Sequence, residues 1–225
     1  MKVQSRIKGL IFRKKIYIGT RKVKAGFIPN DSYMRFNTIP NNKVTDLQIR
    51  ELFEKYPKLN DGIEVRLKES SATEYDNKSI YFGERRLDNN QRHGRGIHMW
   101  IDGSRYEGYW VNDKANIRGK LFHADGDTYE GEWSDDKAHG KGVYTHTDGA
   151  KYEGDWKDDK QDGFGKETWP DSAFYEGEYK QGKKSGHGIF RWNDGSMYEG
   201  FFFNNNINGK GNNFIYFRNI YMATR

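Results

Sequence analysis

The sequence has no cysteine and few prolines. The absence of cysteine excludes disulfide bonds, a thiolate nucleophile and a cysteine-based zinc site. Four prolines beside 26 glycines exclude collagen-like repeats and proline-rich linkers. No apolar run reaches the roughly 20 residues that a membrane-spanning helix needs. The first twelve residues also lack the long apolar core of a secretory signal.

Charged and aromatic residues are both frequent. Charged residues make up 31% of the 225 residues, which favours disorder, but 16% Phe, Trp and Tyr provides enough buried area for a thin fold. Residues 1–45 hold eleven of the 38 Lys and Arg and one of the 32 Asp and Glu, a balance of +10, whereas the remainder carries −4. The chain is therefore a basic arm followed by a mildly acidic body, and a basic arm indicates an acidic partner.

A motif recurs every 23 residues through the body of the chain. Each unit begins with Tyr-Glu-Gly, has an aromatic residue two positions later, and continues through Gly-x-Gly to Asp-Gly. An earlier unit opens at Tyr81 with two extra residues in its loop. Two units deviate, because Ile117 replaces the first glycine of one Gly-x-Gly and Ser172 replaces the glycine of one Asp-Gly. The other leading tyrosines are Tyr106, Tyr129, Tyr152, Tyr175 and Tyr198.

The motif predicts one β-hairpin for each unit. Alternation along Tyr-Glu-Gly-Glu-Trp places tyrosine, glycine and tryptophan on one face and the acids on the other. Asp-Gly predicts a tight turn with positive φ at glycine. Since one hairpin cannot bury its own face, the hairpins should stack into a continuous antiparallel sheet over residues 78–211. We expect Gly131, Gly154 and Gly177 to lie on the aromatic side, beneath rings of neighbouring units.

The repeated sequence, met best by Tyr129 to Lys151, resembles the membrane occupation and recognition nexus (MORN) repeat. The resemblance covers about six units and implies an all-β, elongated, single-layer antiparallel sheet of stacked hairpins. The family includes ciliary spoke components, junction-forming membrane proteins, cytoskeletal scaffolds of protists and accessory arrays on plant lipid kinases. In none of them is the repeat itself catalytic. The resemblance therefore implies a scaffold or interaction protein, not an enzyme.

The segments around the array have different patterns. Residues 1–44 have no clean period and are predicted to form an extended basic arm. Residues 45–77 should hold a short helix from Thr45 to Tyr56 and a strand, which together cap the array at its N-terminal end. Residues 212–225 lack a further Asp-Gly turn and are predicted to close the array or to meet a partner.

One aromatic column is a candidate partner groove. Its side chains recur every 23 residues on the face that a single-layer sheet leaves uncovered, although they can equally be the core of the fold. The recurring acids fit a solvated face paired with lysines, and histidines of successive units lie too far apart to share a metal. No catalytic residue, metal ligand or cofactor is therefore expected. The groove candidates are Trp100, Leu121, His123, Tyr144, His146, Trp169, Phe190 and Trp192.

The basic arm is the second candidate site. An acidic filament surface such as tubulin or an axonemal protein is the preferred partner, and a membrane containing phosphoinositides is the alternative. Nucleic acid is not expected, because no reading motif accompanies the charge. We predict a structural subunit of a ciliary or cytoskeletal assembly, with a mitochondrial location as a lesser alternative. The candidate contacts are Arg13, Lys14, Lys15, Arg21, Lys22 and Lys24.

Overall fold

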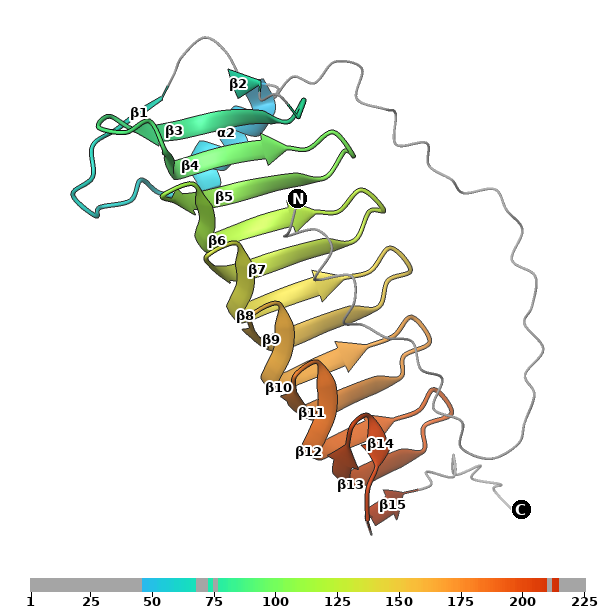
Figure 1. The fold of residues 1–225 in the computed structure, drawn as a ribbon. Coiled ribbons are helices and arrows are strands. Elements are labelled where there is room, and N and C mark those ends of the chain that lie inside the picture. Colours follow the sequence, from blue (N-terminus) through green and yellow to red (C-terminus); the bar gives the residue numbers. More distant parts are fainter. Residues whose placement is uncertain (1–45, 68–72, 75–76, 210–211, 215–225) are drawn as a thin grey trace, which may run out of the picture.

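The computed structural model describes residues 46–67, 73–74, 77–209 and 212–214. They form one open sheet with helix α2 (Asp46–Lys55) against one of its faces (Figure 1). The strands are β1 (Val65–Leu67), β2 (Thr73–Glu74), β3 (Ile80–Arg86), β4 (Arg92–Met99), β5 (Arg105–Val111), β6 (Lys114–Phe122), β7 (Thr128–Ser134), β8 (Lys137–Thr145), β9 (Lys151–Lys157), β10 (Lys160–Thr168), β11 (Phe174–Lys180), β12 (Lys183–Arg191), β13 (Met197–Phe203), β14 (Asn206–Ile207) and β15 (Asn212–Phe214).

The strands lie side by side in chain order, each antiparallel to the next, from β3 to β14. At the first edge, β1 and β2 both pair with β3, and at the last edge β14 and β15 both pair with β13. The prediction of a single meandering sheet is confirmed for the described part of residues 78–211, which contains no helix. Each edge thus ends in two short strand pieces, which suits an edge that must not template further pairing.

A row of glycines crosses the middle of the sheet. Eleven strands, β3 to β13, contribute one glycine each, and every glycine in this row is paired with a glycine on the adjacent strand. A Cβ on Gly154 would lie 2.5 Å from Gly165 Cα, and one on Gly165 would lie 2.3 Å from the Tyr152 hydroxyl. These glycines are on the aromatic side, as predicted. The ring above each pair belongs to the tyrosine of the same hairpin, so the expectation of a neighbouring unit's ring was wrong.

Aromatic rings form a continuous ladder along the same face, here called the aromatic face. Four leading tyrosines, from Tyr106 to Tyr175, each lie edge-on between the aromatic residue of their own strand and that of the next unit. Tyr129, for example, is 5.2 Å from Trp133 and 5.1 Å from Trp156, both in T-shaped geometry. The Trp133 and Trp156 indole N–H groups each donate to a glycine carbonyl of the preceding unit at 3.1 Å. Because such pairs contribute about 0.5–1.5 kcal/mol each beyond area burial, the ladder stabilises a fold with little aliphatic core.

Each leading tyrosine also satisfies a backbone carbonyl at an irregular point of its hairpin. The Tyr129 hydroxyl donates to the Glu132 carbonyl at 2.9 Å, where the β7–β8 register shifts between Gly131 and Glu132. Tyr81, Tyr106, Tyr152, Tyr175 and Tyr198 make the same bond to the residue three positions later. A β-bulge disrupts the ladder locally, so the hydroxyl provides a partner for a buried polar group.

Two kinds of turn join the strands. The Asp-Gly turns have positive φ at Gly103, Gly126, Gly149 and Gly195, as predicted, and Ser172 adopts φ 70° where it replaces glycine. The opposite turns have two consecutive residues at positive φ, such as Asp135 (48°) and Asp136 (67°). Asp136 N–H donates to the Ala115 carbonyl at 2.9 Å, and its carboxylate accepts from Ala115 N–H at 2.7 Å. Each such turn therefore fastens its hairpin to the preceding one.

Helix α2 packs on part of the other face of the sheet, here called the helix face. Leu52 and Tyr56 are buried against Ile97 and Tyr109. The Tyr109 hydroxyl donates to the Pro57 carbonyl at 2.7 Å. The helix thus lies on a face over β4 and β5, whereas the N-terminal edge is formed by β1 and β2. Thr45, the first residue of the predicted helix, is outside the described residues.

Candidate interaction surface

The predicted groove residues separate by burial. Leu121, Tyr144 and Phe190 are buried in the cluster of the aromatic ladder. His123 is also buried, whereas His146 is partly exposed. Trp100, Trp169 and Trp192 are partly buried and pack on the edge of the same cluster. The accessible part of the column is therefore the three tryptophans and His146, and its use by a partner stays a prediction.

One position of the column stands two residues before the aspartate of each Asp-Gly or Asp-Ser pair, and it holds Trp100, His123, His146, Trp169 or Trp192. Its carbonyl accepts the turn N–H, as in Gly103 to Trp100 at 3.0 Å, and its own N–H donates to the residue after the turn. The turn therefore fixes the backbone of the column while leaving the ring at the rim of the aromatic face. A rigid row of partly exposed rings is suited to contact with a partner, because little conformational entropy is lost on binding.

Asp127 organises the column around His146. One carboxylate oxygen accepts from the Tyr144 hydroxyl at 2.9 Å and lies 2.9 Å from His146 Nδ1. The other oxygen accepts from Thr147 N–H at 3.0 Å. Burial raises the pKa of the Tyr144 hydroxyl, and its hydrogen bond to Asp127 raises this pKa further. Sequence reasoning missed Asp127, although its departure from the small residues Ser104 and Ala150 at the same repeat position was visible.

A buried ion pair replaces apolar residues farther along the aromatic face. Lys184 Nζ lies 2.5 Å from the Glu167 carboxylate, which also accepts from the Tyr179 hydroxyl at 3.1 Å. Lys184 also lies 5.1 Å from the ring centroids of Trp169 and Tyr175. The Glu167 position holds His98 in the first hairpin and Leu121, Tyr144 or Phe190 in three others, and this pair was not predicted. It places a charge in the middle of the aromatic ladder.

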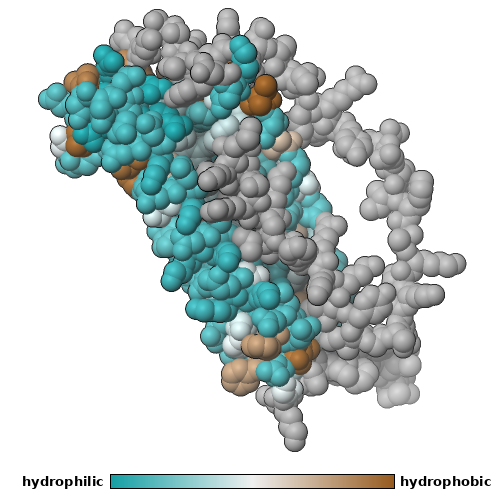
Figure 2. Space-filling view, in the orientation of Figure 1, coloured by the Kyte–Doolittle hydropathy of each residue, from teal (hydrophilic) through white to brown (hydrophobic). Residues whose placement is uncertain are grey.

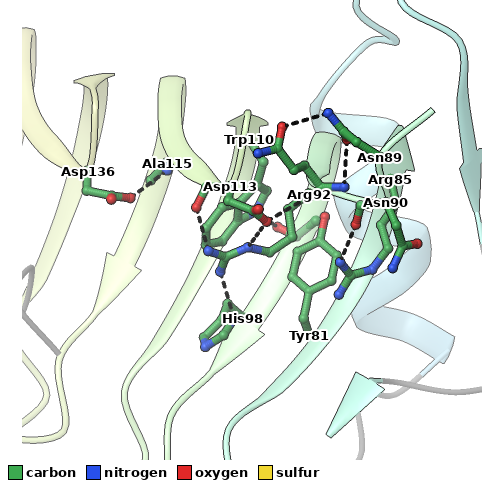
Figure 3. A network of polar contacts seen from close by, with 12 residues as sticks. Tyr81, Arg85, Asn89, Asn90, Arg92, His98, Trp110, Asp113, Ala115 and Asp136 are labelled. Carbon is green, nitrogen blue, oxygen red and sulfur yellow. Dashed lines mark hydrogen bonds and ion pairs between the residues drawn. The ribbon is translucent and has the colours of Figure 1, made fainter. Parts of the chain in front are cut away.

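Arginines take the place of apolar side chains in the first hairpin (Figure 3). Arg92 lies over the Trp110 ring, 4.1 Å from its centroid, and pairs with the Asp113 carboxylate at 3.1 Å. Arg92 also contacts His98 Nδ1 at 3.2 Å. Burial and the Arg92 guanidinium lower the pKa of His98 to about 3, so this ring is neutral near pH 7. The first hairpin thus continues the ladder with stacked guanidinium groups.

The second acid of each repeat binds the backbone of its own hairpin. The carboxylate accepts from the N–H in the middle of Gly-x-Gly, as Glu132 does from Lys141 at 3.1 Å and Asp155 from Phe164 at 2.8 Å. A Cβ on Gly140 would lie 2.2 Å from the Glu132 carboxylate. Where Tyr109 replaces the acid, Ile117 replaces the glycine. The two changes occur in one repeat, and this signal was available in the sequence.

The first acids of the repeats lie on the helix face and partly pair with lysines, as Lys120 does with Glu130 at 3.1 Å and Lys166 with Glu176 at 2.9 Å. Among the described residues, no group of three or more His, Asp or Glu is placed to hold a metal ion. No helix within the described part of the chain is long and apolar enough to cross a membrane. The six basic candidates of the arm lie outside the described residues.

The model of the MORN repeat matches residues 88–105, 106–128, 129–151, 152–173, 175–197 and 198–212, which is more than half of the chain. The chain belongs to the MORN repeat family. MORN repeats suggest a non-catalytic interaction or scaffold module. The hairpins described above are these repeats, and the hairpin from Tyr81 begins before the first matched residue.

Comparison with known proteins adds little beyond the family. A search of the curated proteins finds no match. Among solved structures, the chain is similar to the TCP10 domain of Danio rerio CPAP in complex with a peptide of Danio rerio STIL. The two are 11% identical with a TM-score of 0.24, and the match covers 62% of this chain and 68% of that one. The E1021V mutant of the same domain is 12% identical with a TM-score of 0.22, covering 63% and 90%. At these TM-scores the likeness carries no argument.

Proposed function

We propose that this protein is a non-catalytic scaffold subunit of a ciliary or cytoskeletal assembly. The observation that supports it best is the continuity of the array. Every hairpin is bonded to the preceding one through the sheet and most also through a turn such as that of Asp136, and the aromatic ladder runs through all of them. The result is an extended surface that holds binding groups at fixed intervals. Such a surface is suited to positioning other protein subunits.

The surface of the array also supports a role as an interaction module. Figure 2 shows a largely hydrophilic exterior between the two ends of the array in that view. Trp100, Trp169 and Trp192 are only partly buried against the aromatic ladder. Tryptophan is enriched where the binding energy of an interface concentrates. The charge of residues 1–45 favours an acidic filament such as tubulin, or an axonemal protein, as the partner.

Microtubule co-sedimentation of the full chain tests the filament proposal. We expect the protein to pellet with microtubules, and a variant with alanine at Arg13, Lys14, Lys15, Arg21, Lys22 and Lys24 to stay in the supernatant. Flotation with vesicles that contain phosphatidylinositol 4,5-bisphosphate is the parallel measurement. Vesicle binding without filament binding would favour the alternative, a membrane-tethering module, and would contradict the cytoskeletal one.

A further inference from the structure

The helix face has two pairs of adjacent strands with apolar character, one at each end of the array. Each pair consists of the second strand of one repeat and the first strand of the next. In the first, β4–β5, Ile97 and Tyr109 are 0% and 8% exposed because helix α2 covers them. The Tyr56 and Tyr109 rings meet in T-shaped geometry at 5.3 Å. The Tyr56 hydroxyl also donates to the Glu107 carbonyl at 3.3 Å. This strand pair therefore shows how the sheet of this protein binds a helix.

The strand pair β12–β13, four repeats farther along, carries the same residue pattern. Ile189 lies opposite Glu199, as Ile97 lies opposite Glu107. Phe201 occupies the position of Tyr109, and Phe203 that of Val111. No strand pair between these two has both an isoleucine and an aromatic residue at these positions. The residues equivalent to Tyr109 in the intervening repeats are Glu132, Asp155 and Glu178.

The difference between the two strand pairs is that nothing described covers the second one. Phe201 is 57% exposed and Phe203 is 59% exposed. Phe201 meets only His187 edge-on at 5.5 Å among the described rings. An acid at position 201 would bind the Gly-x-Gly backbone, as Glu178 does at 2.9 Å, so the phenylalanine gives up a hydrogen bond and exposes an apolar ring.

We propose that the helix face of β12–β13 is a docking site for an amphipathic helix of another protein chain. The bound helix presents an aliphatic residue and an aromatic residue four positions apart, as Leu52 of α2 and Tyr56, which directly follows α2, do to β4–β5. Glu199 is equivalent to Glu107, which lines one hollow with Lys55 of α2 and lies close enough to feel its charge. Glu199 therefore provides a counter-charge for a lysine placed like Lys55. The site lies on the face opposite the aromatic column, so its failure would leave the scaffold proposal standing.

A synthetic peptide of residues 46–58, which carries the α2 contacts, serves as the probe. It is titrated into the isotope-labelled full-length protein and followed by backbone amide resonances. We expect shifts at β12–β13 in the native protein. The double variant Phe201→Glu with Phe203→Lys carries the residues that the preceding repeat has at Glu178 and Lys180. We expect it to bind the peptide at least about tenfold more weakly than the native protein does. Because Glu and Lys at these positions are compatible with the fold of the preceding repeat, the double variant is a matched control. Phe201→Glu alone is the second variant.

Three outcomes would overturn the proposal. The first is equal binding by the native protein and both variants, and the second is a set of shifts confined to β4–β5, where the peptide would merely exchange with α2. The third is that the native protein self-associates in sedimentation velocity through Phe201 and Phe203 without binding the peptide. That result would assign the surface to a second copy of the chain. Retention of shifts at β12–β13 that the variants lose supports helix docking.

Discussion

At the scale of single residues, one tyrosine determines what its neighbours can be. The Tyr152 ring lies over Gly154 and Gly165, and its hydroxyl donates to the Asp155 carbonyl at 3.0 Å. Alternation along the strand was enough to predict that Gly154 faces the aromatic side. It did not predict which ring lies there, because sequence spacing gives the face of a side chain but not the direction in which it leans.

Replacing a glycine of the central row should therefore destabilise the protein. A Cβ at Gly154 would meet the backbone of β10, 2.5 Å from Gly165 Cα and 2.6 Å from the Phe164 carbonyl, and neither can move aside easily. We expect Gly154→Val to lower the free energy of unfolding by about 1–3 kcal/mol. Glu153→Val is the matched control on the opposite face of the same strand. A thermal or denaturant unfolding curve measures both, and equal effects would contradict a packing role for the glycine.

Ile117 is a second residue whose conformation makes a prediction. It has φ 63° with a β-branched side chain, at a position where other repeats have glycine. The left-handed region costs a non-glycine residue about 1–2 kcal/mol. We expect Ile117→Gly to raise the free energy of unfolding by about 0.5–1 kcal/mol. The strain at positive φ is removed, but the greater freedom of glycine in the unfolded chain offsets part of this stabilisation. Ile117→Ala keeps the strained φ and should give no gain; an equal gain from alanine would show that the side chain is the cause.

At the scale of secondary-structure elements, the turns divide into those that sequence identifies and those that it does not. Asp-Gly is a known signal for positive φ, and these turns were predicted. Asp135-Asp136 is a less usual pair for two consecutive positive φ values, and the bonds between Asp136 and Ala115 of the preceding hairpin hold it. Helix α2 was predicted as a cap at the N-terminal end of the array, but the face that it covers was not predicted. Tyr109, which breaks the pattern of acids, was the residue that indicated a covered face.

The pairing of β10, β11 and β12 depends on a buried charge. Removing one partner of the Glu167–Lys184 pair leaves the other charge buried, with a cost of about 3–5 kcal/mol. We therefore expect Glu167→Leu and Lys184→Ala each to destabilise the protein strongly. These are the residues at the equivalent positions Leu121 and Ala138, so the double variant should unfold close to the native protein. A double-mutant cycle from urea unfolding measures the coupling, and additive losses would contradict it.

At the scale of the whole molecule, the fold is a one-dimensional stack in which each hairpin contacts its neighbours. The period of 23 residues predicted this architecture, because it reports which contacts repeat. The period contained no information about where repeats differ for function. Glu167, Arg92 and Phe201 each depart from the pattern, and their meaning depends on neighbours that only the folded sheet brings together.

The basic arm makes a prediction at this scale. Deleting residues 1–40 removes charge and apolar side chains but none of the bonds described in the array. We expect the shortened protein to melt at nearly the native temperature while losing incorporation into its assembly. Circular dichroism measures the first, and co-purification with the assembly from cell extract measures the second. Normal incorporation of the shortened protein would contradict an anchoring role of the arm.

The broken strands at both edges have a consequence for length. Among the described residues, β1 with β2 at one end and β14 with β15 at the other leave no long edge on which a second copy can continue the sheet. The span of one molecule is then set by its number of hairpins, so the protein can serve as a gauge. Inserting one further 23-residue hairpin between β8 and β9 should move Phe201 about 10 Å farther from helix α2. Every contact at either end would stay the same, so distance alone would change.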